Sequence, residues 1–242
     1  MKWNFLKSIV DGILDAVAPR HCLGNGSCLS KNDRFEKSLL SNTFLDSLEI
    51  APDSDEIILH CQDILGKDNV RIKQFHALYL FENDSPIQEV IHYFKYKHYQ
   101  MLGTSLGTLL GEMLKKQYKR LPEVIIPIPL HPVRIRERGF NQAAIIAKAV
   151  GNVLQRPVLT QNVLRTIYRK PQALQEFSNR IKLDEGMFSV RNSESIEKKH
   201  VLLIDDVLTT SSTVNAVART LLYAGAKRVD TAVLCYTKPK KY

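Results

Sequence analysis

Two adjacent carboxylates and five hydroxyl side chains lie within nine residues of one another. The segment VLLIDDVLTTSST (201–213) places Asp205 and Asp206 directly after an apolar run. The hydroxyl residues that follow are Thr209, Thr210, Ser211, Ser212 and Thr213. Carboxylates accept hydrogen bonds from a diol, and hydroxyls donate them to a phosphate. The pattern therefore predicts a site for a ligand that carries both a ribose diol and a 5′-phosphate.

The flanking elements must bring these groups together. The run HVLLID (200–205) predicts a buried strand, and STVNAVARTLLYAGA (212–226) predicts a helix closed by Gly225. In open α/β sheets, ligands bind beyond the carboxyl ends of the strands. The N-terminus of the following helix offers free N–H groups and a positive dipole end, which favour a phosphate. We expect the acids and the hydroxyl cluster to meet at this junction.

The spacing of residues argues against two other interpretations of the same segment. A Walker-type phosphate loop needs GxxxxGK followed by Ser or Thr, and a dinucleotide fold needs a glycine fingerprint directly after a strand. Residues 205–213 contain neither. The structural alternative is an ordinary strand end followed by a Ser or Thr N-cap, but such a cap requires only one hydroxyl.

From Phe75 onward, strand and helix patterns alternate, which is typical of an α/β fold with a parallel sheet and right-handed crossovers. Continuous apolar runs predict strands that are covered on both faces. The other predicted strands are FHALYLF (75–81), EVIIPIPL (123–130) and RVDTAVLCYT (228–237). The other predicted helices are SPIQEVIHYFKYKHY (85–99), TSLGTLLGEMLKKQY (104–118) and NQAAIIAKAVGNVL (141–154). Ser85 is the expected cap of the first. The expected buried stripe of the second is Leu106, Leu109, Leu110 and Met113.

Residues 1–70 differ in character from the rest. MKWNFLKSIVDGILDAVAP (1–19) predicts an amphipathic helix, whose acidic residues argue against a signal peptide. Residues 19–70 are rich in loop-forming residues. We therefore expect an N-terminal helix with a small appendage over 1–70 and a larger domain over 71–242. No run of about 18 apolar residues occurs, so we expect no transmembrane span, and only weak membrane attachment through the helix.

The composition limits the compartment and the partners. The four cysteines and the absence of a secretory pattern favour a reduced, cytoplasmic chain. The net charge of +9 favours polyanionic partners, either phosphorylated metabolites or nucleic acid. Basic residues gather at 115–120, 134–139, 165–170 and 238–241, which suggests contact with single-stranded DNA unless these are solvated faces.

Residues 201–213 resemble the 5-phosphoribosyl 1-pyrophosphate (PRPP) motif of the type I phosphoribosyltransferases. PIPLHPVRIRERGFNQ (127–142) and LRTIYRKPQALQEFSNR (164–180) are similar to segments of the ComF family, phosphoribosyltransferase-like proteins linked to natural competence. FHALYLF and IQEVIHYFKYK match the segment that precedes them. The resemblance covers about residues 75–237. It implies a type I phosphoribosyltransferase-like parallel sheet flanked by helices, with a small loop-rich N-terminal appendage.

The resemblance also implies roles for individual residues. Asp205 and Asp206 are the catalytic acids that hold the ribose hydroxyls, and Thr209 to Thr213 wrap the 5′-phosphate. Mg²⁺ bridges the diphosphate and the hydroxyls while phosphoribose passes to a base or an amine. The expected pyrophosphate-binding residues are Leu130, His131, Arg134, Arg136, Arg138, Lys95 and Lys97. For His131 a role as a base competes with a conformational role before Pro132.

Two departures from the family pattern carry expectations of their own. The family usually has Gly where this chain has Ser211, and Gly serves positions that need positive φ. We expect the backbone at Ser211 to be right-handed or the loop to be rearranged, with affinity for PRPP reduced or lost. The family's paired CxxC zinc knuckles are missing. A mixed zinc site would draw on His21, Cys22, Cys28, His60 and Cys61; the alternative is a metal-free appendage.

Three functions remain open at this stage. The first is a phosphoribosyltransferase associated with competence and DNA uptake. The second is a non-enzymatic module that binds PRPP or a phosphorylated nucleotide, or that docks competence machinery. The third is a factor that binds single-stranded DNA directly.

Overall fold

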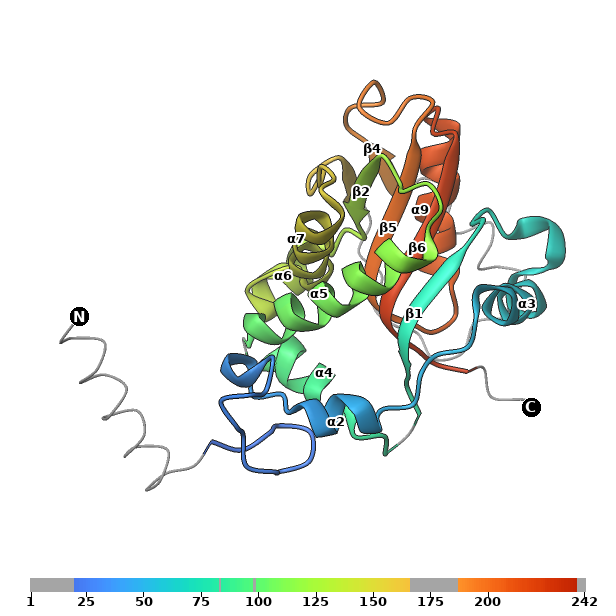
Figure 1. The fold of residues 1–242 in the computed structure, drawn as a ribbon. Helices are drawn as coiled ribbons and strands as arrows, with labels where there is room; N and C mark the ends of the chain where they lie inside the picture. Colours follow the sequence, from blue (N-terminus) through green and yellow to red (C-terminus); the bar gives the residue numbers. More distant parts are fainter. Residues whose placement is uncertain (1–19, 83, 98, 166–186, 239–242) are drawn as a thin grey trace.

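The structure is a computed structural model, which describes residues 20–82, 84–97, 99–165 and 187–238 (Figure 1). Its centre is a four-stranded parallel sheet with the strand order β1-β6-β5-β2. The strands are β1 (Phe75–Leu80), β2 (Val124–Pro127), β5 (His200–Leu208) and β6 (Arg228–Tyr236). All four strands predicted from the sequence are confirmed, and most of their residues are buried because helices cover both faces.

The register aligns the ends of the strands. Val124 pairs with Val201, His200 pairs with Arg228, and Leu80 pairs with Tyr236. One edge of the sheet therefore holds all four strand starts, the amino edge, and the opposite edge holds all four strand ends, the carboxyl edge. Strand β5 runs three residues beyond the predicted end at residue 205, so both acids belong to the strand itself.

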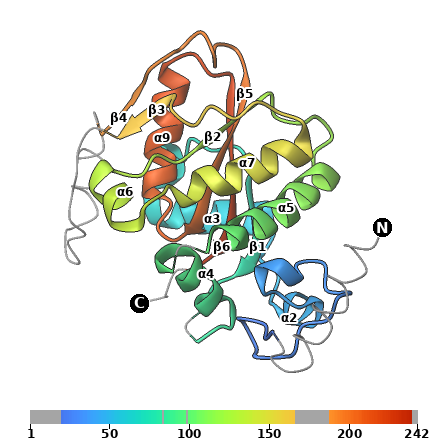
Figure 2. The same cartoon turned by 90° about the vertical axis from the view of Figure 1, so that its left-hand side faces the viewer.

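Helices α4 (Ile87–Tyr96), α5 (Gln100–Gln117) and α7 (Gln142–Leu154) cover one face of the sheet. Figure 2 shows α5 and α7 lying side by side. They approach closely, because a Cβ added at Gly107 would lie 2.9 Å from Ala149 Cβ and 3.0 Å from the Ile146 carbonyl oxygen. The buried leucines of α5 are Leu102, Leu106, Leu110 and Leu114; the predicted stripe is wrong at Leu109 and Met113, which are only partly buried.

The other face is covered by α9 (Ser212–Tyr223) and α3 (Ser54–Leu65). Sequence analysis missed α3, which lies in the segment expected to be loop-rich. Asp53 caps it by accepting a hydrogen bond from the Glu56 N–H (3.0 Å), and Ile57, Cys61 and Leu65 form its buried side. Ile57 and Cys61 belong to the same apolar cluster as residues of β5, β6 and α9.

The remaining described elements are short. They are two 3-10 helices (Glu36–Ser38 and Lys67–Asn69), α2 (Asn42–Ser47), α6 (Pro132–Arg138) and the antiparallel pair β3 (Val163–Arg165) and β4 (Phe188–Val190). The predicted helix 1–19 and most of segment 164–180 lie outside the described residues. The domain boundary near residue 70 stays a prediction. Within the described residues, no helix is long and apolar enough to cross a membrane.

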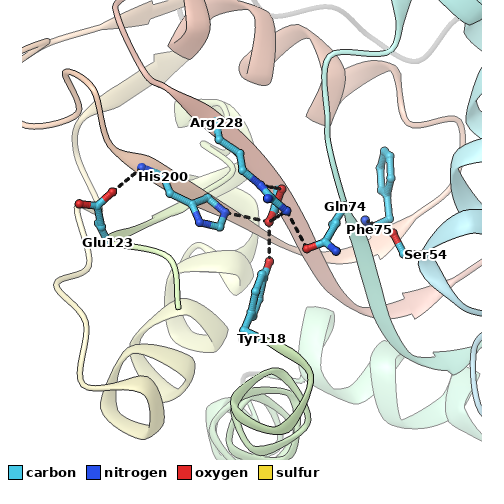
Figure 3. A network of polar contacts seen from close by, with 8 residues as sticks. Ser54, Gln74, Phe75, Tyr118, Glu123, His200 and Arg228 are labelled. Carbon is cyan, nitrogen blue, oxygen red and sulfur yellow. Dashed lines mark hydrogen bonds and ion pairs between the residues drawn. The ribbon is translucent and has the colours of Figure 1, made fainter. Parts of the chain in front are cut away.

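A buried polar network joins the strand starts at the amino edge (Figure 3). The Asp230 carboxylate is fully buried and accepts hydrogen bonds from His200 Nε2 (2.7 Å), Arg228 Nε (2.9 Å) and the Tyr118 hydroxyl (2.9 Å). Burial acts to raise the pKa of Asp230, but the hydrogen bonds from His200 and Arg228 outweigh it and lower the pKa. This network ties the starts of β5 and β6 to Tyr118, the residue that follows α5.

Candidate functional site

The two acids lie near the carboxyl end of β5, next to the first turn of α9. Asp205 Oδ1 accepts a hydrogen bond from the Asp206 N–H (2.9 Å), and Asp206 Oδ1 accepts one from the Val207 N–H (2.7 Å). Each carboxylate keeps a second oxygen. Both side chains are only partly buried, so the pair is reachable from the carboxyl edge, where the parallel register places the ends of all four strands.

Lys95 neutralises one of the acids. Its Nζ lies 3.1 Å from Asp206 Oδ2, and the exposed fractions of the two side chains are 20% and 13%. Lys95 belongs to the last turn of α4, so this helix lies beside the acid pair. The sequence prediction placed Lys95 at a pyrophosphate; in the described structure its partner is the acid itself.

Asp205, the other acid, has a raised pKa. Burial and then the neighbouring Asp206 charge raise the pKa of Asp205 to about 7, and Lys95 and Arg138 act in the opposite direction. Two carboxylates side by side in a partly dry setting resist ionising together. Asp205 is therefore protonated more readily than an ordinary carboxyl.

The loop between β5 and α9 presents the predicted hydroxyl cluster. Thr209 and Thr210 are exposed, and Ser212 and Thr213 are half-buried. Ser211 is the N-cap of α9 and makes no side-chain capping bond. The first N–H groups of α9 thus receive no cap from this residue, and a helix N-terminus in this state favours a bound anion.

The expectation for the backbone at Ser211 is wrong. Its φ of 59° and ψ of −5° are left-handed, so the loop keeps the conformation for which Gly is suited. A non-glycine residue in this region costs about 1 kcal/mol. The Ser211 side chain is buried, and its Oγ lies 2.8 Å from Cys61 Sγ. Ser211 is thus suited to offer a phosphate its backbone N–H rather than its hydroxyl.

The turn predicted to bind pyrophosphate follows β2, the neighbour of β5 in the sheet. Leu130 and His131 are both partly buried there. His131 Nδ1 accepts a hydrogen bond from the Val133 N–H (3.2 Å) and so caps α6. Desolvation lowers the pKa of His131, and the charges of Arg165 and Arg136 lower it further. A neutral, capping imidazole agrees with the conformational role.

The three arginines after this turn have different surroundings. Arg138 is the one near the acids, because its charge acts on Asp205. Its Nη1 donates to Gln142 Oε1 (3.3 Å), its Nη2 lies 3.4 Å from the Tyr96 hydroxyl, and its Cζ lies 5.3 Å from the centroid of the Tyr96 ring. This side chain spans α6, α7 and the end of α4.

The other predicted cations are not drawn to the acid pair. Arg134 forms an ion pair with Glu137 (2.9 Å), and Arg136 is exposed. Lys97 is exposed and lines a separate hollow of about 390 Å³ on the outer side of α4. The structure therefore brings Lys95 and Arg138 to the acids, whereas Arg134 pairs with Glu137, and Arg136 and Lys97 are exposed.

Similarity to known proteins identifies the family of this chain. The family described as "Phosphoribosyl transferase domain" matches residues 112–242, just over half of the chain. A DNA utilization protein of Shigella flexneri, YhgH, is 31% identical over 159 residues, which cover 63% of this chain and 68% of YhgH. The chain is a phosphoribosyl transferase domain protein of the ComF family. The match and the parallel sheet together confirm the predicted fold class.

Other relatives of this ComF protein carry related names. Competence protein ComFC of Bacillus subtilis is 29% identical over 159 residues, which cover 66% of this chain and 62% of ComFC. The chain thus spans less than two thirds of that relative. Among solved structures, a purine phosphoribosyltransferase of Pyrococcus horikoshii is 21% identical with a TM-score of 0.35, over 56% of this chain and 72% of that protein.

The mixed zinc site is not assembled in this ComF protein. Cys22 accepts a hydrogen bond from the Ser41 N–H (3.4 Å), and Cys28 Sγ lies 3.9 Å from His21 Nδ1. His60 and Cys61 lie on α3 at the other face of the sheet, with partners of their own. Between residues 20 and 238, in the parts that are described, no three His, Cys, Asp or Glu side chains form a group that could hold a metal ion.

Three contributors to the site were missed. Gln142 is buried beside Arg138, and its Nε2 lies 3.5 Å from the Lys95 carbonyl oxygen. Tyr96 supports Arg138, and Arg165 lies close enough to His131 to lower its pKa. The sequence offers one signal for Gln142, its place in the GFNQ segment (139–142). It was missed because a polar residue at the start of an apolar helix is usually expected at the surface.

Proposed function

We propose that this protein binds PRPP with Mg²⁺ at the carboxyl edge and transfers phosphoribose to a base or an amine. The observation that carries the proposal is the junction of β5 and α9. There, two carboxylates directly precede a loop whose left-handed turn at Ser211 opens a helix N-terminus. Membership of the phosphoribosyl transferase domain family supports the same ligand class.

Different groups of the chain bind different parts of PRPP. The first N–H groups of α9, with Thr209 and Thr210, hold the 5′-phosphate, because the helix dipole favours an anion there. Asp205 and Asp206 accept hydrogen bonds from the ribose hydroxyls. The turn at Leu130 and the guanidinium of Arg138 face the pyrophosphate side, where a planar fork suits phosphate oxygens.

Mg²⁺ fits the donor set, since the two carboxylates supply the hard oxygen ligands that it prefers. When bound, it would neutralise charge on the pyrophosphate. In the transfer, the bond from C1 of the ribose to the pyrophosphate oxygen breaks, and pyrophosphate leaves with the electron pair. The acceptor nitrogen forms the new bond to C1 and loses a proton. The carboxylates stabilise positive charge that develops on the ribose ring, so catalysis is chiefly positioning and electrostatics.

We further propose that this reaction serves the uptake or use of DNA in the cytoplasm. The support is the names of the relatives, "Competence protein ComFC" and "DNA utilization protein YhgH". All four cysteines are free, which agrees with a reducing compartment.

A second candidate function is binding without transfer, as a sensor of PRPP or of a phosphorylated nucleotide. The observation that favours it is the ion pair between Lys95 and Asp206, which leaves fewer free charges for a leaving pyrophosphate. A sensor would bind PRPP and release no pyrophosphate.

Calorimetry separates these cases. The protein is titrated with PRPP in the presence of Mg²⁺, alongside the double variant Asp205→Asn/Asp206→Asn and the matched control Asp46→Asn/Asp63→Asn. We expect binding in the wild type and the control, and none in the site variant. Pyrophosphate release is then assayed with nucleobases and ammonia: release supports transfer, binding without release supports the sensor, and equal binding in the site variant refutes both.

A further inference from the structure

Two neighbouring residues of α3 reach the carboxyl edge of the sheet. Cys61 Sγ lies 2.8 Å from Ser211 Oγ, in the loop between β5 and α9. His60 Nδ1 lies 2.7 Å from the hydroxyl of Tyr236, the last residue of β6, and the two rings are nearly parallel with an interplanar angle of 7°. Helix α3 therefore contacts both the end of a central strand and the loop that opens α9.

The contact with Ser211 falls where the loop needs support. A left-handed conformation is natural for Gly but unfavourable for Ser, so something outside the backbone must stabilise it. Ser211 makes no capping bond to α9, and its hydroxyl is instead turned to Cys61. Both side chains are almost fully buried, at 4% and 1% exposure, so water does not compete for this contact.

The thiol can take part in this hydrogen bond, in which either it or the Ser211 hydroxyl is the donor. Burial raises the pKa of Cys61 to about 11, so the sulfur is protonated at neutral pH. The adjacent His60 fixes α3 on the sheet through Tyr236, which fixes where the sulfur lies.

We propose that Cys61 is a positioning residue: its thiol holds Ser211 in the left-handed conformation that aims the first N–H groups of α9 at the ligand phosphate. The inference rests on the proposed PRPP site and adds a residue that does not touch the ligand. Cys61 was a candidate ligand of the mixed zinc site, and Ser211 is the residue that departs from Gly in the phosphate loop. The two side chains contact each other.

A double-mutant cycle tests the inference. The variants are Cys61→Ala, Ser211→Gly and the two combined, with Cys61→Ser as the conservative replacement. Cys22→Ala is the control, because it also removes a buried thiol but lies in the other apolar cluster. The measurements are PRPP affinity by calorimetry and hydrogen exchange of the backbone amides of residues 209–213.

We expect Cys61→Ala to weaken PRPP binding about threefold, somewhat less than the value of one ordinary hydrogen bond because a thiol bonds weakly, and to accelerate exchange in the loop. In the Ser211→Gly background the same change should alter affinity less than twofold, because Gly holds the conformation unaided. Cys61→Ser should restore most of the affinity, and Cys22→Ala should leave both readouts unchanged.

An equal loss of affinity in both backgrounds would overturn the inference, since it would reflect only a cavity under the loop. If the wild type itself does not bind PRPP, the proposed function fails, and the exchange data decide the inference alone. Unchanged exchange at residues 209–213 in Cys61→Ala then rejects it. If Cys61→Ala does not fold, Cys61→Val takes its place in both backgrounds, because Val fills the space of the thiol but has no hydrogen-bonding group.

Discussion

Asp205→Asn should make the protein more stable at alkaline pH while removing its proposed function. The pKa of Asp205 is about 7 in the fold, against about 3.9 for an unfolded chain. A carboxyl whose pKa is raised on folding weakens stability as the pH rises from the unfolded value to the folded one. A difference of about three pH units corresponds to at most about 4 kcal/mol. Because the Asp205 side chain is only partly buried, solvent screens part of this effect, and we expect about 2 kcal/mol.

The measurement is urea unfolding of the wild type and Asp205→Asn between pH 4 and 8.5. Asn keeps the oxygen that accepts from the Asp206 N–H, so the substitution removes the charge and little else. The variant should be about 2 kcal/mol more stable at pH 8.5, and its advantage should shrink to about 0.5 kcal/mol or less near pH 4, where the wild type is protonated. Asp63→Asn, at an exposed site on α3, controls for the change of residue type.

Either of two results would refute this reasoning. A variant less stable than the wild type at pH 8.5 would mean that the Asp205 charge stabilises the fold. An advantage that does not vary with pH would mean that the pKa of Asp205 is the same in the folded and the unfolded chain. A stability gain coupled to loss of PRPP binding would show that the acid pair is maintained for its chemistry.

Three further predictions concern other parts of the molecule. Lys95→Met should lower the free energy of unfolding by about 1–2 kcal/mol, measured in urea. It should also raise the pKa of Asp205 further, because Lys95 acts to lower that pKa; in an NMR titration, the midpoint of the Asp205 carboxyl should move to higher pH. Asp230→Asn should cost about 3 kcal/mol at pH 7, and the difference should diminish as the pH falls through the lowered pKa of Asp230, where the wild type loses the same charge. Gly107→Ala should lower thermal stability by about 2 kcal/mol, because its Cβ would lie 2.9 Å from Ala149 Cβ; a stabilised variant would show that α5 and α7 can separate.

The sheet was predictable because its signal is local. Each central strand is a continuous apolar run, and covering both faces demands such a run. Helix α3 was missed because its sequence, SDEIILHCQDIL, follows a loop-like stretch and its role depends on distant partners. Cys61 meets Ser211 across 150 positions of the chain, and no local pattern carries such a pairing.

The candidate site was predictable in kind but not in detail. Asp205 and Asp206 were found from their place after a strand, whereas the partner of Lys95 depends on how α4 packs. The sequence shows residues 134–139 only as a basic cluster, whereas Arg134 and Arg138 lie on a short helix in which Arg134 pairs with Glu137. The left-handed Ser211 contradicted the residue preference, because a tertiary contact outweighed a local cost of about 1 kcal/mol.

The amino-edge network around Asp230 and the candidate site occupy opposite ends of the same strands. Interactions that keep the chain folded are thus separated, by the length of β5 and β6, from groups such as Asp205 whose burial opposes folding. Replacement of Asp205 itself therefore meets little resistance from the fold. Such a scaffold suits both evolutionary divergence and laboratory redesign: selection can alter what the loop at Ser211 recognises while Asp230 and its partners preserve the architecture.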